Sequence, residues 1–201
     1  MKPVVGPLLR VTLYGVGLLV LGDVVLHRLP TPDHPLDLFG EYGRLEWVQV
    51  GILLACLAVS VLTAIQRPAS RPLSILLAGA LVAVLVREHN NYFKDHHFSG
   101  LWQLIVGAVL AVTVLVAWRW RSHLVPALRA LVSLPAFGWL CAAVLLTAFA
   151  QLLDEQSLWD FVLEGGAVPY AARRVAEETT EVAAFYLFLV GLIEYRLTLD
   201  G

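Results

Sequence analysis

The sequence predicts an all-α fold: a polytopic bundle of six transmembrane helices in a single domain that covers residues 1–201. Apolar residues make up 59% of the chain and charged residues only 15%, whereas soluble domains have roughly 25% charged residues. Six long apolar segments follow one another, and a bilayer-spanning helix needs about 20 such residues. These segments lack the alternation of transmembrane strands, so helices are the structure that satisfies their backbone in lipid.

The six expected helices follow one another with short polar connections. They cover approximately residues 8–29, 47–66, 72–87, 101–120, 131–153 and 169–197. The third is short for a bilayer, which predicts a tilted or shallow helix. Residues 154–168 are expected to form an outer loop with a short interfacial helix, because Ser157-Leu158-Trp159-Asp160 resembles a helix start and Gly165-Gly166 favours a turn.

Charged residues fall into two sets along the chain. Connections after the first, third and fifth segments hold nearly all the acids, whereas those after the second and fourth contain arginine and no Asp or Glu. Lys and Arg in short loops favour the cytoplasmic side. We therefore expect cytoplasmic termini, an extracytoplasmic acidic end and a location in a bacterial inner membrane. A net charge of −2 provides no basic field for nucleic acid.

Ionisable residues also enter the apolar segments at the acidic end. A rise of 1.5 Å per residue puts Asp23 and Glu181 about 10 Å below the outer membrane boundary. An unpaired Asp at such depth costs at least ~2.5 kcal/mol, so we expect both carboxylates to face one interior pocket. His27 lies four residues after Asp23 and shares its helix face, which makes Asp23, His27 and Glu181 the candidate catalytic acids and bases.

The most specific hypothesis for this pocket is a metal site. Glu177 and Glu181 share a helix face, and Glu88-His89 ends another expected helix at a similar depth. Carboxylates with imidazole suit zinc, iron or manganese, so these four residues are the expected ligands of a divalent metal. The sequence contains no His-Glu-x-x-His or Cys-x-x-Cys motif. A plainer interpretation is that Glu177 favours the start of its helix and Glu181 forms a structural ion pair with arginine.

These features predict a membrane-embedded, metal-dependent enzyme, a hydrolase, that acts on a lipid or lipid-linked substrate from the extracytoplasmic side. Arg87, Lys94 and Arg174 are the expected contacts for an anionic group of the substrate. The alternative is a small transporter, binding or accessory subunit whose pocket takes up a cation or a proton. The inner halves of the helices offer few polar groups for a transport path. Small-x-x-x-small pairs such as Gly79/Ala83 indicate close helix packing and leave a homo-oligomer open.

Overall fold

The computed structural model describes residues 5–25, 43–89, 100–162 and 170–199, and within these ranges it is helical without strands. The all-α prediction is therefore confirmed. The described helices are α1 (Val5–Asp23), α3 (Arg44–Gln66), α4 (Arg71–Glu88), α6 (Leu101–Trp118), α7 (Arg121–Val132), α8 (Pro135–Asp154), α9 (Gln156–Val162) and α10 (Tyr170–Thr198).

Four of these helices, α1, α3, α6 and α8, are long and apolar enough to cross a membrane. This finding supports a membrane protein. The other two long helices are set apart by their charges. Helix α4 contains Arg71, Arg87 and Glu88, and α10 contains four glutamates and three arginines.

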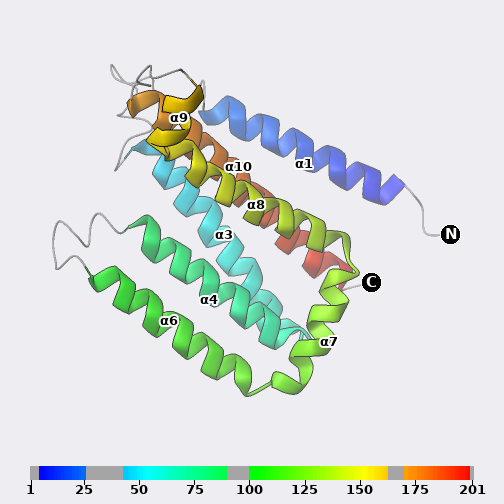
Figure 1. The fold of residues 1–201 in the computed structure, drawn as a ribbon. Helices are drawn as coiled ribbons and strands as arrows, with labels where there is room; N and C mark the ends of the chain where they lie inside the picture. Colours follow the sequence, from blue (N-terminus) through cyan, green and yellow to red (C-terminus); the bar gives the residue numbers. More distant parts are fainter. Residues whose placement is uncertain (1–4, 26–42, 90–99, 163–169, 200–201) are drawn as a thin grey trace.

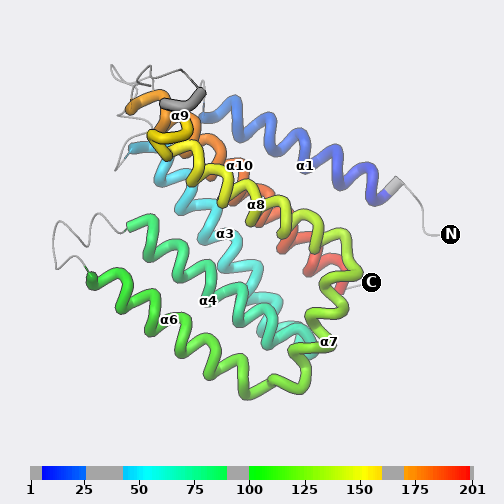
Figure 2. Tube along the Cα trace, in the orientation of Figure 1, coloured from blue at the N-terminus to red at the C-terminus, as the bar shows by residue number. Residues whose placement is uncertain are grey.

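The long helices run side by side and alternate in direction (Figure 1). One end of the bundle gathers the end of α1, the start of α3, the end of α4, the start of α6, α9 and the start of α10. The opposite end holds the turn between α3 and α4 and the additional helix α7, which connects α6 to α8 (Figure 2). This alternation brings the charged start of α10 close to the ends of α4 and α8.

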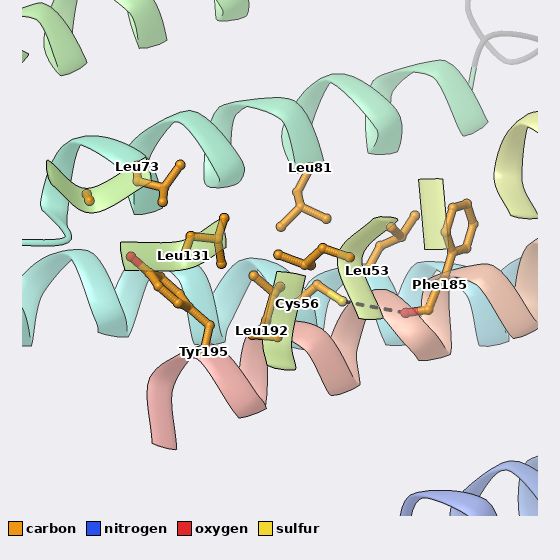
Figure 3. Packing of buried hydrophobic residues seen from close by; sticks show 11 residues of the cluster. Leu53, Cys56, Leu73, Leu81, Leu131, Phe185, Leu192 and Tyr195 are labelled. Carbon is orange, nitrogen blue, oxygen red and sulfur yellow. Dashed lines mark hydrogen bonds between the residues drawn. The ribbon is translucent and has the colours of Figure 1, made fainter. Parts of the chain in front are cut away.

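Helix α10 lies at the centre of the packing. It contacts α8 most extensively and also packs on α3, while α4 joins α3 to α6. Figure 3 shows the apolar core that these contacts bury, with Leu53 and Cys56 of α3 against Phe185 and Leu192 of α10. At Gly191, a Cβ would come within 2.8 Å of Leu140, so the glycine allows α8 and α10 to approach closely.

Helices α1 and α6 lie at the periphery of the bundle. No residue of the apolar stretch Gly6–Asp23 is buried, and the main contact of α1 is a small one with α10. The principal partner of α6 is α4, where Gly79 sits directly against Thr113. Both peripheral helices therefore expose apolar side chains over most of their length, as helices in lipid do.

Candidate functional site

Four glutamates form a carboxylate cluster at the end of the bundle where α10 begins: Glu88, Glu177, Glu178 and Glu181. The three α10 glutamates are buried, because α10 is covered there by α3 and α8. Their i, i+3 and i, i+4 spacing places Glu181 on one face with the other two. Glu88, the last residue of α4, lies within electrostatic range of Glu177 and Glu181.

Arg174 neutralises part of this cluster from within α10. Its Nη1 donates a 2.6 Å hydrogen bond to Glu177 Oε2, and its Nη2 pairs with Glu178 Oε1. The three residues are one turn apart, so the helix itself aligns the guanidinium with both carboxylates. The arginine side chain is only 17% exposed, so the two ion pairs are largely shielded from water.

Two glutamine side chains from other helices complete the hydrogen bonding of the α10 glutamates. Gln49 of α3 is fully buried, and its Nε2 donates to Glu178 Oε2 over 2.7 Å. Gln151 of α8 donates through Nε2 to Glu181 Oε1 over 2.8 Å. A neutral amide satisfies a carboxylate oxygen but adds no positive charge.

Arg87 of α4 forms the exposed edge of the site. Its Nη2 donates to Gln151 Oε1 over 3.0 Å and lies 3.5 Å from Glu181 Oε1. The Arg87 side chain is 39% exposed, whereas that of Glu181 is 4% exposed. Arg87 and Gln151 therefore cover a buried carboxylate, and a ligand approaching from this side meets the guanidinium first.

The charges of the described site residues do not balance. Arg87 and Arg174 form ion pairs with three of the four carboxylates, those of Glu177, Glu178 and Glu181. Glu88 Oε1 and Gln49 Oε1 are buried and have no hydrogen-bond partner within the described ranges. Buried charges and polar atoms are costly unless they are paired. The site is thus suited to receive a proton, a cation or a polar group of a ligand.

An apolar cavity of about 410 Å³ adjoins the carboxylate cluster. Helices α3, α4, α8 and α10 contribute its apolar lining, and Arg87 and Gln151 belong to its wall. The lining extends along α4 from Ala80 to Arg87, about 10 Å at the helical rise. A polar site and an apolar cavity therefore share the same two side chains, Arg87 and Gln151.

The structure brings some of the residues predicted from sequence together at one site and places others elsewhere. Glu177, Glu181, Arg174, Arg87 and Glu88 lie at one site, and the expected pairing of Glu181 with arginine is present. His89 is the residue that follows α4, and its Nδ1 lies 2.9 Å from the Leu85 carbonyl oxygen of the same helix. Within the described part of the chain, no three His, Cys, Asp or Glu side chains are placed to hold a metal.

The prediction that Asp23 faces the interior together with Glu181 is wrong. Asp23 is exposed at the end of α1, because the chain packs there through Leu21 and Val25 against Leu45 and Val182, and Asp23 lies on another face of the helix. The depth estimate gave the position of Asp23 along the helix but not the face that it occupies. The predicted His27 and Lys94 lie outside the described residues.

Sequence reasoning assigned no role to Gln49 and Gln151, which make direct contacts with the cluster. A usable signal was present: each is an amide in an apolar helix, close to the end where the acids gather.

Comparison with known proteins adds no assignment, because no family model matches the chain and no similar curated protein or solved structure was found.

Proposed function

We propose that this protein is a membrane-embedded enzyme that acts on a lipid or lipid-linked substrate. The observation that carries the proposal is the contact between a charged cluster and an apolar cavity. An amphiphile fits such a site, with its hydrocarbon chain among the side chains of Leu81, Val84 and Phe188 and its polar group beside Arg87. Ligand sites of this kind combine an apolar lining with a few convergent polar groups.

The carboxylates supply the chemistry in this proposal. Glu181 is the general base: it takes a proton from a water molecule that attacks the substrate and returns it to the leaving group, so the reaction is a hydrolysis. Arg87 contacts an anionic group of the substrate, since a guanidinium binds phosphate or carboxylate oxygens in a planar fork. Arg174 has a positioning role, because it is already bonded to Glu177 and Glu178.

A divalent cation is part of the proposal as the partner of the excess carboxylates. The side chains of Glu88, Glu177 and Glu181 are not placed to hold a metal as described, so they would have to turn toward one another to offer oxygen ligands. The buried Glu88 Oε1, which has no hydrogen-bond partner among the described residues, supports this part of the proposal. His89 would join them only through its Nε2, because Nδ1 is next to the Leu85 carbonyl oxygen. Zinc, manganese and iron are the candidates. The cation would then supply Lewis acidity to the substrate.

A second function is favoured by the same charge excess. A non-enzymatic binding or accessory subunit would take up a cation or a proton at the carboxylate cluster without chemical change of a lipid. The unpartnered oxygens of Glu88 and Gln49 are the observation that favours it. The two functions differ in a measurable product, which only the enzyme forms.

The topology belongs to the proposal as well. We propose that α4 and α10 also span the membrane, that both termini are cytoplasmic and that the carboxylate cluster opens to the outside of a bacterial inner membrane. Support comes from the acid-free connections at the opposite end, where Arg67, Arg119 and Arg121 lie. Modification of an Ala69→Cys variant, at an exposed position of the α3–α4 turn, by an impermeant thiol reagent added to intact cells would contradict this orientation.

The enzyme is tested in nanodiscs made from total bacterial lipid extract, with lipid species followed by mass spectrometry. We expect the protein to convert at least one lipid class, and Glu181→Gln to lower the rate at least a hundredfold, the usual contribution of a general base. Glu194→Gln is the matched control, because Glu194 is a buried glutamate of the same helix at the opposite end of the bundle.

Each result decides between the functions. Conversion that persists in Glu181→Gln would exclude its role as base. No lipid conversion by the folded wild-type protein, together with stoichiometric metal in the purified sample, would favour the cation-binding subunit. Loss of conversion after chelation and recovery with one of zinc, manganese or iron would establish the cation.

A further inference from the structure

A second apolar groove, separate from the carboxylate cluster, lies between α3, α4 and α6. Its volume is about 740 Å³. Helix α4 packs on both α3 and α6, so α4 forms the floor and the other two helices form the walls, as their order in Figure 1 indicates. Apart from Arg71 and Thr113, nearly all lining side chains are apolar.

The charged residue of this groove, Arg71, is placed at one end of it. Arg71 begins α4, and its guanidinium stacks over the Trp120 ring at 5.5 Å from the ring centroid. Its Nε donates to the Ala64 carbonyl oxygen over 3.0 Å, which fixes the side chain at the turn between α3 and α4. Arginine stacked on tryptophan is typical of the boundary between lipid and water.

The length of the groove corresponds to one leaflet. The lining extends along α4 from Arg71 to Val82, and on the other side from Val109 of α6 to Trp120, just after the end of that helix. The α4 stretch covers about 16 Å at the helical rise, and half of a bilayer's hydrocarbon core is about 15 Å. A chain that starts beside Arg71 would therefore end near the middle of the membrane.

The segments that form the groove's polar end contain no acidic residue. Residues 64–86 and 101–133, which supply the turn and both helices there, contain no Asp or Glu. Arg121, close in sequence to Trp120, stacks on Trp118 at 5.4 Å. Positive groups with interfacial tryptophans and an apolar groove complement a molecule that has an anionic head and long hydrocarbon chains.

We infer that this groove is a binding site for an anionic glycerophospholipid, with its phosphate beside Arg71 and an acyl chain between α3 and α6. The site lies at the end of the bundle opposite the carboxylate cluster, and the inference is independent of the proposed enzymatic function. The bound lipid would fill the space that α3 and α6 leave above α4.

The test is native mass spectrometry of the detergent-purified protein with phosphatidylglycerol and phosphatidylcholine of identical chains. We expect wild type to retain phosphatidylglycerol in preference. Arg71→Gln should reduce that preference about fivefold, the effect of one basic residue near an anionic lipid. Arg129→Gln is the matched control, because Arg129 is an exposed arginine of α7 outside the groove.

A second pair of variants tests the acyl chain and does not depend on Arg71. Val112 and Val114 are both exposed on α6, but only Val112 lines the groove. Val112→Trp should obstruct the groove and lower retention of phosphatidylglycerol, while Val114→Trp should leave it unchanged. Equal retention of both lipids by wild type, or equal behaviour of the two tryptophan variants, would overturn the inference.

Discussion

Helix α10 carries buried glutamates near both of its ends, and these carboxylates are paired differently at the two ends. Near the C-terminal end of α10, Glu194 faces α1: Tyr14 Oη donates to Glu194 Oε1 over 2.6 Å, and Arg10 Nε lies 3.3 Å from the same oxygen. One carboxylate thus has one guanidinium and one hydroxyl. At the start of α10, its three glutamates share two guanidinium groups, and Glu88 of α4 lies nearby.

The two ends of α10 differ in how completely their carboxylates are paired. The Glu194 arrangement is balanced and fastens α1 to α10, with Tyr186 Oη donating to the Tyr14 carbonyl oxygen over 2.8 Å. Within the described residues, the carboxylate cluster has more carboxyl groups than guanidinium partners, and the buried Glu88 Oε1 has no hydrogen-bond partner there. A buried excess of charge lowers stability, and for this reason the proposed function is placed at the start of the helix.

The largest expected change in the free energy of unfolding comes from replacing Arg174. Arg174→Gln would leave Glu177 and Glu178 buried without their cation, and we expect the free energy of unfolding to fall by about 3–5 kcal/mol. Circular dichroism during unfolding in detergent measures it. Arg173→Gln is the control, because Arg173 contacts the Asp154 carbonyl oxygen and a half-exposed carboxylate, so about 1 kcal/mol is expected. Equal losses would remove the distinction between the two arginines.

A smaller effect of opposite sign is expected at Glu88. Without divalent cations, Glu88→Gln should raise the free energy of unfolding by roughly 1 kcal/mol, because it relieves repulsion among neighbouring carboxylates. Glu155→Gln, at an exposed acid near the end of α8, should change nothing. If zinc or manganese stabilises wild type but not Glu88→Gln, a cation is the missing partner. A loss of stability in the cation-free variant would show that the cluster is already balanced.

The smallest effect is expected at Glu194. Glu194→Gln keeps an oxygen that accepts from Tyr14 and loses only the ion pair with Arg10. Since the Arg10 side chain is 36% exposed and reaches water, we expect a loss below about 1 kcal/mol. Thermal unfolding in the same detergent measures it, with Tyr14→Phe as the variant that removes the hydrogen bond alone. A loss as large as that of Arg174→Gln would mean that both ends of α10 are alike.

Composition and the length of apolar segments were sufficient to predict an all-helical membrane protein, because crossing lipid requires long helices whose backbone groups bond within the segment. The gathering of Glu88, Glu177 and Glu181 was also predictable. In a chain that alternates in direction, the acidic ends of successive helices meet at the same end of the bundle.

Tertiary structure decided which of these acids are covered and by what. Asp23 and Glu181 look alike in sequence, each a carboxylate in an apolar helix, yet α10 is enclosed by α3 and α8 while α1 has little contact with the bundle. Helices that are apolar on all sides do not reveal which face meets a neighbour. For the same reason, the contacts of Gln49 and Gln151 with the glutamates followed only from the packing of helices that are distant in sequence.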